Sequence, residues 1–206
     1  MSPRRPDIAP LRREDLDDDP IRQVAAWLER ALAEAPLAEA MALATLDERG
    51  RPDARMVLLK GIDERGFRFF THYDSAKGHQ LAATPAAAVI LYWRELDRQV
   101  RARGTVERLP AAESDAYFAS RPHDARVGAM ASPQSEPIGS REELERRVAE
   151  VEQLLAGAEP ERPSTWGGYL LRPDEVELWQ GQEARLHDRF RYTRDGDGWR
   201  IERLAP

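Results

Sequence analysis

Three basic residues, Arg185, His187 and Arg189, recur at every second position within the stretch WQGQEARLHDRFRY near the C-terminus. Because side chains alternate between the two faces of a β-strand, this spacing predicts that all three lie on one face of a strand. Three like charges side by side repel one another and are costly to desolvate. The face is therefore either solvated or directed at a bound anion, to which these groups would donate charge-assisted hydrogen bonds.

A second set of residues could bind a phosphate group at the start of a short predicted helix, residues 75–85. Ser75 is the expected N-cap, Lys77 follows in the first turn, and Thr71 comes shortly before in the sequence THYDSAKG. Backbone N–H groups left free at a helix N-terminus, together with hydroxyls and an ammonium group, favour a bound phosphate. A plain helix cap with no ligand is the alternative for the same residues.

Two further pairs of residues could hold an anionic ligand. Arg55 and Lys60 stand at the two ends of the apolar run RMVLLK, and residues five apart on a regular strand face opposite ways. Tyr117 and Arg121 share one face of a predicted helix, where a phenol beside a guanidinium suits an anion or an aromatic ring with an anionic arm. Each pair also has a structural explanation, as charges that reach solvent or as a ring packed on an arginine stem. The polar positions that carry no signal of their own are Gln99, Gln134 and Ser135.

Several kinds of chemistry find no support in the sequence. The order of residues shows no Ser/His/Asp arrangement, no pair of catalytic carboxylates, no P-loop and no glycine fingerprint for a dinucleotide. The chain has no cysteine, which excludes disulfides and thiolate metal sites, and its four histidines are not at metal-ligand spacing. We therefore expect no metal.

Composition bounds the class of protein. The chain has 206 residues and a net charge of −6, which suits one domain with a sizeable core and gives no reason to expect nucleic acid or an anionic membrane as a partner. No apolar run approaches the length of a membrane span, and the first residues do not form a signal peptide, so a cytoplasmic location is expected. Residues 1–18 are charged and proline-rich and are expected to be flexible, while residues 19–206 form the single domain.

Short apolar runs separated by glycine-containing turns predict antiparallel hairpins. About eight strands are expected, with four helices near residues 21–35, 75–85, 110–122 and 141–157, and a loop from about 127 to 139. Helices that interrupt hairpins do not give parallel β–α–β alternation. The expected fold is therefore mainly β with peripheral helices (α+β), as a closed or nearly closed antiparallel barrel, with a two-layer α+β sheet as the second choice.

Several motifs resemble the pyridoxine/pyridoxamine 5′-phosphate oxidase family, in the family's order and from about residue 11 to 206. They are RMVLLKG, YFASRP, the Gln-Ser pair at 134–135, WGGY, EVELWQG, RLHDRFRY and the closing WRIERLAP. The resemblance implies an FMN-binding split β-barrel and a homodimer with FMN in clefts at the subunit interface. It also implies oxidation of pyridoxine or pyridoxamine 5′-phosphate to pyridoxal 5′-phosphate, with O₂ reoxidising the flavin to give H₂O₂.

The same resemblance assigns roles to residues. The flavin contacts would be Arg55, Met56, Val57, Leu58, Leu59, Lys60, Phe70, Thr71, Lys77, Gln99, Gln134, Ser135, Trp179 and Arg189, with Arg55 and Lys77 on the FMN phosphate. The substrate phosphate would be held by Lys60, Tyr117 and Arg121, while Arg185 and His187 would act as the catalytic residues beside the pyridine ring. The basic face would then serve two ligands, which relieves its repulsion, and Asp188 on the opposite face could offset charge.

Three positions depart from the family pattern. Ala76 stands where an arginine usually accompanies Lys77 on the FMN phosphate, Ala125 where a serine usually contacts the substrate phosphate, and Met130 where a tryptophan is common. A hydrogen bond to a charged group contributes roughly 1.5–3 kcal/mol, so FMN affinity could fall by about one to two decades. Two other readings stay open: a split-barrel flavin oxidase of another aromatic natural product, of the phenazine type, and a non-catalytic binder of FMN or pyridoxal phosphate.

Overall fold

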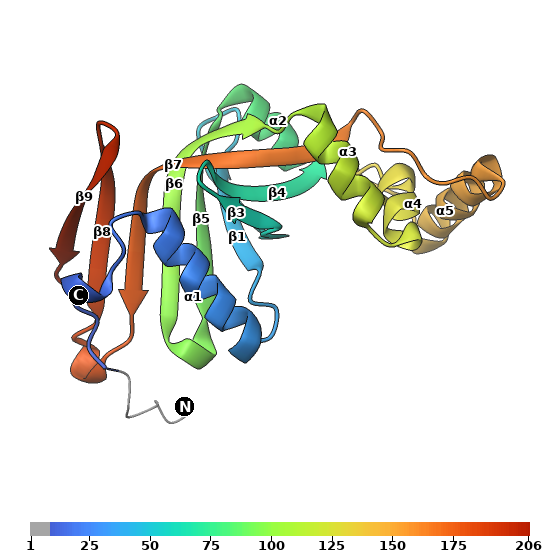
Figure 1. Ribbon diagram of the computed structural model, residues 1–206. Helices are drawn as coiled ribbons and strands as arrows, with labels where there is room; N and C mark the ends of the chain where they lie inside the picture. Colours follow the sequence, from blue (N-terminus) through green and yellow to red (C-terminus); the bar gives the residue numbers. More distant parts are fainter. Residues whose placement is uncertain (1–8) are drawn as a thin grey trace.

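The computed structural model describes residues 9–206, which form nine strands in a single antiparallel sheet with five α-helices around it (Figure 1). The strands are β1 (Ala40–Leu46), β2 (Pro52–Leu58), β3 (Gly61–Asp63), β4 (Gly66–His72), β5 (Ala86–Trp93), β6 (Arg98–Arg108), β7 (Trp166–Gln180), β8 (Asp188–Asp195) and β9 (Gly198–Leu204). The helices are α1 (Pro20–Glu34), α2 (Ala76–Ala83), α3 (Ala111–Ser120), α4 (His123–Ala131) and α5 (Arg141–Leu155).

The long strand β7 organises the sheet. The strand order is β2-β1-β5-β6-β7-β4-β3, and β8 and β9 continue from the second half of β7, so that its first half pairs with β4 and its second half with β8. A register shift at Arg103/Gly104 accompanies the change, and a Cβ at Gly104 would lie 1.9 Å from the carbonyl oxygen of Arg172. Bulges of this kind bend a strand, and the sheet curls into a half-barrel (Figure 1). The predicted antiparallel split barrel is confirmed.

The inner face of the sheet is apolar and buried. One row of paired residues crosses β1, β5, β6 and β7 through Leu43, Val89, Ala102 and Val176, all at most 2 % exposed. Helix α1 lies across this face and contributes Trp27 to the same core (Figure 1). Asp19 caps its start, because its side chain accepts from the Ile21 N–H group, and Pro20 occupies the first turn.

The N-terminal segment differs from the expectation of flexibility from residue 11 on. Residues 1–8 lie outside the described residues. Leu11 and Leu16 are buried in the main core, and Arg13–Asp15 forms a 3₁₀ turn. The phenol of Tyr192 donates a 2.9 Å hydrogen bond to the carbonyl of Asp17. Residues 11–18 are therefore anchored on the domain, through long-range contacts that local composition does not reveal.

Helix α4 replaces part of a predicted loop. The helix runs over His123–Ala131 directly after Pro122, and the irregular segment begins only at Ser132. Proline before a helix is compatible with its first turn, and the alanines at 125, 129 and 131 favour helix despite Gly128. Among residues 9–206, no helix is both long enough and apolar enough to cross a membrane.

Candidate functional site

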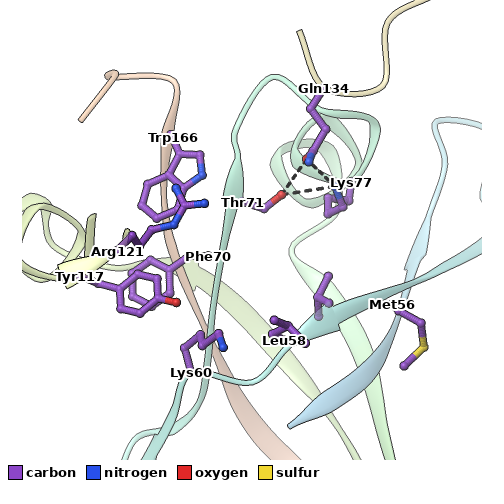
Figure 2. Close-up of a pocket in the computed structure, with 11 residues that line it drawn as sticks. Met56, Leu58, Lys60, Phe70, Thr71, Lys77, Tyr117, Arg121, Gln134 and Trp166 are labelled. Atoms are coloured by element: carbon purple, nitrogen blue, oxygen red, sulfur yellow. Dashed lines mark hydrogen bonds between the residues drawn. The ribbon is translucent and has the colours of Figure 1, made fainter. Parts of the chain in front are cut away.

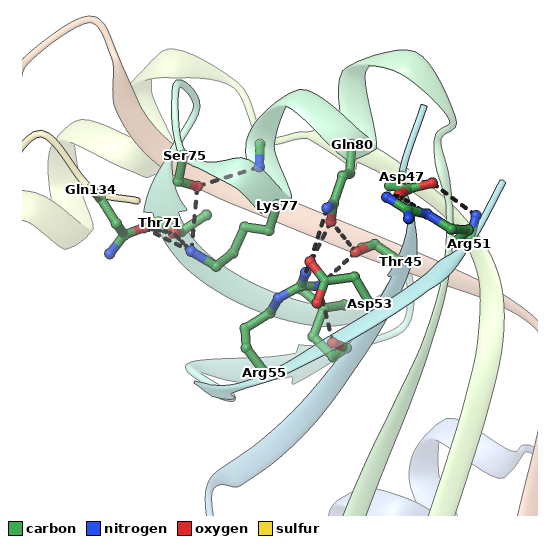
Figure 3. Close-up of polar contacts among 12 residues, drawn as sticks. Thr45, Asp47, Arg51, Asp53, Arg55, Thr71, Ser75, Lys77, Gln80 and Gln134 are labelled. Atoms are coloured by element: carbon green, nitrogen blue, oxygen red, sulfur yellow. Dashed lines mark hydrogen bonds and ion pairs between the residues drawn. The ribbon is translucent and has the colours of Figure 1, made fainter. Parts of the chain in front are cut away.

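The N-terminus of α2 holds a buried ammonium group among hydroxyls and an amide. Lys77 is 8 % exposed, and its Nζ donates to Gln134 Oε1 at 2.8 Å and to Thr71 Oγ1 and Ser75 Oγ, both at 3.3 Å (Figure 3). Ser75 also caps the helix by accepting from the Gly78 N–H group. A Cβ at Gly78 would lie 2.0 Å from the Tyr73 carbonyl oxygen, so glycine lets the helix start pack directly on the turn after β4.

The electrostatics of this region favour an anion. Burial, followed by the nearby positive charge of Arg55, lowers the pKa of Lys77. Burial likewise lowers the pKa of the adjacent His72, and the charges of Lys77 and Arg121 add to that shift. A negatively charged group placed beside Lys77 would favour the protonated forms of Lys77 and His72, and would therefore raise both pKa values again. The helix N-terminus adds its partial positive charge in the same place.

Arg55 lies near the N-terminus of α2, but its guanidinium is hydrogen-bonded to other side chains of the protein. Its guanidinium donates to Thr45 Oγ1 at 2.6 Å, to Asp53 Oδ2 at 2.5 Å and to Gln80 Oε1 at 2.9 Å (Figure 3). Gln80 in turn donates to the same carboxylate oxygen of Asp53 at 2.9 Å. The side chain therefore points along β2 toward α2, and Arg55 does not line the cavity described next.

A cavity of about 260 Å³ opens next to Lys77 (Figure 2). Strand β2 and the residues after it form one side, β4 and the start of β7 another, and the start of α2, the end of α3 and the loop after α4 the rest. Its lining residues are Met56, Val57, Leu58, Lys60, Phe70, Thr71, Lys77, Tyr117, Arg121, Gln134 and Trp166. Three cations from three separate elements thus face one space, which is the arrangement expected around a ligand with anionic groups.

Aromatic rings form one wall of this cavity. The rings of Phe70 and Tyr117 are stacked with centroids 3.9 Å apart, and Trp166 is stacked 5.7 Å from Phe70. The Arg121 guanidinium lies 4.8 Å from the centre of the Trp166 ring, and its buried Nη1 has no hydrogen-bond partner among residues 9–206. Burial lowers the pKa of Arg121 and raises that of Tyr117. A buried guanidinium donor without a partner is costly, so it marks a position where an acceptor from a ligand fits.

Trp166 is the lining residue that sequence reasoning missed. It is the first residue of the WGGY motif, which carries part of the family resemblance but predicts no ligand contact for Trp166. A tryptophan at a strand start is normally read as core, and Trp166 is indeed 4 % exposed. Only the positions of α3 and β4 show that its ring also supports Arg121.

A second cluster forms on the outer face of the sheet. Gln99, Trp179 and Arg189 are direct cross-strand neighbours on β6, β7 and β8, and therefore lie in one row on one face. The charge of Arg189 is offset by Glu177, whose Oε1 accepts from Arg189 Nε at 2.9 Å. Asp188 was expected to offset the charge of the basic face. It instead forms an ion pair with Arg203, which lies on β9.

The prediction of one strand face for the three basic residues was wrong. Strand β8 begins at Asp188, so only Arg189 belongs to it. Ala184 and Arg185 have φ of 54° and 63°, which breaks the extended chain and places Arg185 in an exposed turn. His187 remains near the cluster, with its ring 4.7 Å from that of Trp179. Positive φ is uncommon at alanine and arginine, so these residue types give no signal of it in the sequence.

The expected ligand contacts thus divide into groups. Those together in the cavity are Met56, Val57, Leu58, Lys60, Phe70, Thr71, Lys77, Tyr117, Arg121 and Gln134. Those outside it are Arg55, Leu59, Gln99, Ser135, Trp179, Arg185, His187 and Arg189. Leu59 is in the core, and Ser135 is exposed at φ 76°. Trp166 and Trp179 stand at opposite ends of β7, separated by about 40 Å of strand contour at ~3.3 Å per residue.

The departures from the family pattern fall in different places. Met130 does not line this cavity but a neighbouring one of about 300 Å³, which also includes His72, Asp74 and Arg147. The two cavities share Gln134. Ala125 lies on α4 and Ala76 at the start of α2, and neither is a lining residue of the main cavity.

Comparison with known proteins assigns the chain to a family. Residues 28–155 match the family described as pyridoxamine 5′-phosphate oxidase, and residues 166–206 match the pyridoxine 5′-phosphate oxidase C-terminal dimerisation region. The pyridoxine/pyridoxamine 5′-phosphate oxidase of Rubrobacter xylanophilus is 54 % identical over 98 % of both chains. That of Paraburkholderia phytofirmans is 53 % identical over 93 % of this chain and 91 % of the relative.

Solved structures agree on the fold. PhzG from Burkholderia lata, in complex with tetrahydrophenazine-1-carboxylic acid, superimposes with a TM-score of 0.90 at 36 % identity and covers 97 % of this chain and 98 % of PhzG. A pyridoxamine 5′-phosphate oxidase-related FMN binding protein from Nostoc punctiforme shares the fold at a TM-score of 0.73 and 22 % identity, over 91 % of this chain and 98 % of that one. On sequence coverage and identity, the chain belongs to the pyridoxine/pyridoxamine 5′-phosphate oxidase family of oxidoreductases.

Proposed function

We propose that this protein oxidises pyridoxine 5′-phosphate or pyridoxamine 5′-phosphate to pyridoxal 5′-phosphate, with FMN as cofactor and O₂ as electron acceptor. The alcohol and O₂ give pyridoxal 5′-phosphate and H₂O₂, whereas the amine also consumes water and releases ammonia. The observation that carries this proposal is the cavity in which Lys60, Tyr117 and Arg121 face Lys77 across a span lined by apolar strand residues. Two separated cationic ends suit two phosphate-bearing molecules held side by side.

The residues present fit FMN at the α2 end of the cavity. Lys77 is buried with a lowered pKa, at a helix N-terminus that also presents the hydroxyls of Thr71 and Ser75. A phosphate there would compensate the buried ammonium, and Gln134 could turn from Lys77 to the ligand. Met56, Val57 and Leu58 would provide the apolar surface along the ring system. When bound, FMN supplies the electron acceptor for the substrate's C4′ carbon and passes the electrons to O₂.

The substrate would bind at the α3 end. Arg121 Nη1 has no acceptor within the described residues, and Lys60 Nζ is as far as 4.0 Å from its counter-charge on Glu39, so both can turn to a phosphate. The Tyr117 hydroxyl lies in the same group (Figure 2). These three side chains would fix the phosphate and thereby orient the pyridine ring, which is the main contribution that a protein makes to a cofactor-driven reaction.

A homodimer would complete the site. The cavity of one chain lacks Gln99, Trp179, Arg185, His187 and Arg189, which the family resemblance assigns to the ligands. Two copies would combine the cavity of each chain with the second cluster of the other. The match of residues 166–206 to a dimerisation region supports this arrangement.

The outer face of the sheet has the properties of that dimer interface. Met56 and Ile90 belong to one cross-strand row, and Leu58 and Tyr92 lie two residues further along the same strands, so all four share a face. They are 63, 37, 43 and 54 % exposed, respectively. Large exposed apolar side chains in one patch mark interaction surfaces. Tyr92 is the direct neighbour of Gln99, which makes the patch continuous with the second cluster.

In the dimer, Arg185 and His187 would flank the pyridine ring and hold the reacting carbon toward the flavin. Arg185 is exposed in the single chain. This is expected of a group that contacts a ligand held by the other subunit. His187 is braced by Trp179 and by a hydrogen bond to its Nδ1 from the Gln182 N–H group, 3.1 Å long. With Nδ1 as acceptor, His187 carries its proton on Nε2 and can donate it to the ring substituents.

A second candidate is oxidation of a tricyclic aromatic substrate of the phenazine type. The supporting observation is the TM-score of 0.90 with PhzG, which was solved with tetrahydrophenazine-1-carboxylic acid. The substitution of the usual serine by Ala125 also weakens the case for a phosphate at that end. The retained group of Lys60, Tyr117 and Arg121 and the higher identity to the vitamin B6 oxidases favour the first candidate.

The test is product analysis with matched substrates. The FMN-loaded protein is incubated in air with pyridoxine 5′-phosphate, pyridoxamine 5′-phosphate, unphosphorylated pyridoxine or a reduced phenazine carboxylic acid. The proposal expects pyridoxal 5′-phosphate and one equivalent of H₂O₂ from the phosphorylated substrates, and much slower turnover of pyridoxine. Turnover of the reduced phenazine alone would instead establish the second candidate.

A further inference from the structure

Asp188, the first residue of β8, collects an unusual set of hydrogen bonds next to the candidate catalytic turn. The residue is 6 % exposed. Its Oδ2 accepts from the backbone N–H of Leu11 and from Gln182 Nε2, both at 2.9 Å, and its Oδ1 accepts from Arg203 Nη1 at 2.5 Å. A buried carboxylate that accepts three donors, one of them charged, is fixed in position.

The network joins both ends of the chain to this turn. Arg203 on β9 also donates through Nη2 to the Leu11 carbonyl at 2.6 Å, and Gln180 at the end of β7 donates to the Ala9 carbonyl at 2.8 Å. Leu11 and Asp188 are 177 positions apart in the chain. The N-terminal segment therefore lies against the outer end of β7–β9 as a strap, which we define as residues 9–12.

The turn that precedes Asp188 needs external support. Ala184 and Arg185 both have left-handed backbone conformations, which residues with a Cβ rarely adopt. Such conformations persist where the surrounding structure determines them. Gln182 stands at the start of this turn, and its side chain is held by Asp188.

The same Gln182 reaches His187 through its backbone. Its N–H group donates to His187 Nδ1 at 3.1 Å, so the position of Gln182 sets both the orientation of the imidazole and its tautomer. We propose that Asp188 is a positioning residue: through Gln182 it holds His187 as the Nε2-protonated tautomer and fixes the turn that carries Arg185, with the strap of residues 9–12 completing its hydrogen bonds. The catalytic consequence rests on the proposed function, whereas the tautomer does not.

The experiment combines a spectroscopic and a kinetic readout on the full-length FMN-loaded protein. Nitrogen NMR of the ¹⁵N-histidine-labelled protein reports the tautomer, with the His187 signals assigned from a His187→Gln variant. Wild type is expected to show the Nε2-protonated form. In Asp188→Asn, the Asn amide nitrogen replaces one of the two acceptor oxygens and faces one of the three donors from which Asp188 accepts. The hold on Gln182 is weakened, so His187 is expected to become a mixture of tautomers. Flavin reduction by pyridoxine 5′-phosphate is expected to slow by about 10²-fold, as for a misplaced group, with FMN affinity unchanged.

Two further variants make the result decisive. Gln182→Ala keeps the backbone N–H group that donates to His187 but loses the side-chain hydrogen bond to Asp188. It is expected to change the tautomer and the rate of flavin reduction in the same direction as Asp188→Asn. If Asp188→Asn does not fold, Gln182→Ala alone tests the positioning role. Tyr192→Phe is the matched control, because it removes another hydrogen bond to the N-terminal segment, at Asp17, and is expected to change neither readout. A wild-type tautomer and rate in both Asp188→Asn and Gln182→Ala would overturn the proposal. If wild type itself fails to reduce its flavin with vitamin B6 phosphates, the proposed function fails, while an altered tautomer in these variants still supports the positioning role.

Discussion

The guanidinium of Arg121 lies 4.8 Å above the ring of Trp166, and its buried Nη1 has no hydrogen-bond partner in the described part of the chain. The cation packs on an aromatic face and forms no ion pair with a carboxylate of the described residues, which keeps its charge available for a ligand. Phe70 and Tyr117 extend the same stack. The strength of substrate binding should therefore depend on Trp166, even if the substrate phosphate contacts only Arg121.

Replacement of Trp166 is expected to weaken substrate binding through Arg121. A cation–π contact contributes about 0.5–2 kcal/mol, so Trp166→Leu should raise KM for pyridoxine 5′-phosphate by about 2- to 30-fold, with a smaller change in Trp166→Phe. Steady-state kinetics at saturating FMN measure the effect. Trp27→Leu is the control, because Arg98 lies 4.3 Å above the Trp27 ring away from the cavity. Equal KM changes in Trp166→Leu and Trp27→Leu would assign the effect to general loss of packing.

Arginine at position 76 is expected to tighten FMN binding. Ala76 begins α2 next to the buried Lys77, and a hydrogen bond to a charged group contributes roughly 1.5–3 kcal/mol, so Ala76→Arg should lower the Kd for FMN by about one to two decades. Quenching of flavin fluorescence measures the Kd. Ala83→Arg adds the same charge at the other end of α2 and serves as the control. If both variants tighten binding equally, the gain comes from net charge and not from a phosphate contact.

Loss of Arg185 or His187 is expected to slow chemistry while FMN stays bound. Neither side chain lines the cavity beside Lys77, so Arg185→Ala and His187→Ala should keep the Kd for FMN near the wild-type value. Removal of a group that orients or protonates the substrate typically lowers the rate by about 10²–10⁴-fold. Stopped-flow measurement of flavin reduction separates the two quantities. Wild-type reduction rates in both variants would remove these residues from the mechanism.

The dimer arrangement predicts complementation between defective subunits. If each site combines the cavity of one chain with Arg185 and His187 of the other, a mixed dimer of Arg121→Ala and Arg185→Ala chains has one site with both defects and one intact site. Such dimers, purified through two different tags, should recover about half of the wild-type turnover. If each chain supplied its own Arg121 and Arg185, no intact site would form, and turnover would stay at the level of the parent variants.

The pH dependence of stability should contain a contribution from His72. Burial and the charges of Lys77 and Arg121 lower its pKa in the folded state below the ordinary value of 6.5. Well above pH 6.5 the residue is neutral in both states and adds nothing to the pH dependence. As the pH falls through 6.5, the unfolded state gains the proton first and stability is lost. The slope can reach about 1.4 kcal/mol per pH unit for one proton.

Denaturant unfolding of the apo protein at pH 8 and pH 5.5 measures this contribution. His72→Asn should lose less stability than wild type between the two pH values. His79→Asn, which removes an exposed imidazole on α2, is the matched control. An identical loss in wild type and His72→Asn would contradict the assignment.

Local patterns in the sequence account for part of the cavity. The Ser75 cap, the lysine that follows it and the Tyr117/Arg121 pair on one helix follow from short-range rules, and the structure brings Lys77, Tyr117 and Arg121 to one cavity. The ligand roles of these residues follow from the family resemblance and not from the local patterns, each of which also has a structural explanation. The hairpins and most helices follow in the same way from periodicity and turn residues.

The remaining features depend on contacts that no local pattern reports. The left-handed turn at Ala184 and Arg185 contains neither glycine nor asparagine, so a strand was predicted there. Asp188, which follows this turn, accepts a hydrogen bond from the N–H group of Leu11, 177 positions earlier in the chain. Likewise, Glu177 offsets the charge of Arg189 only because β7 and β8 pair in the register observed.

The most direct test of the central claim is anaerobic mixing of the FMN-loaded protein with pyridoxine 5′-phosphate or pyridoxamine 5′-phosphate while the visible absorbance of the flavin is followed. The proposed function predicts rapid bleaching, and full recovery of the absorbance on admission of air, with pyridoxal 5′-phosphate formed in an amount equal to the flavin reduced. A flavin that binds but stays oxidised with both substrates would contradict it.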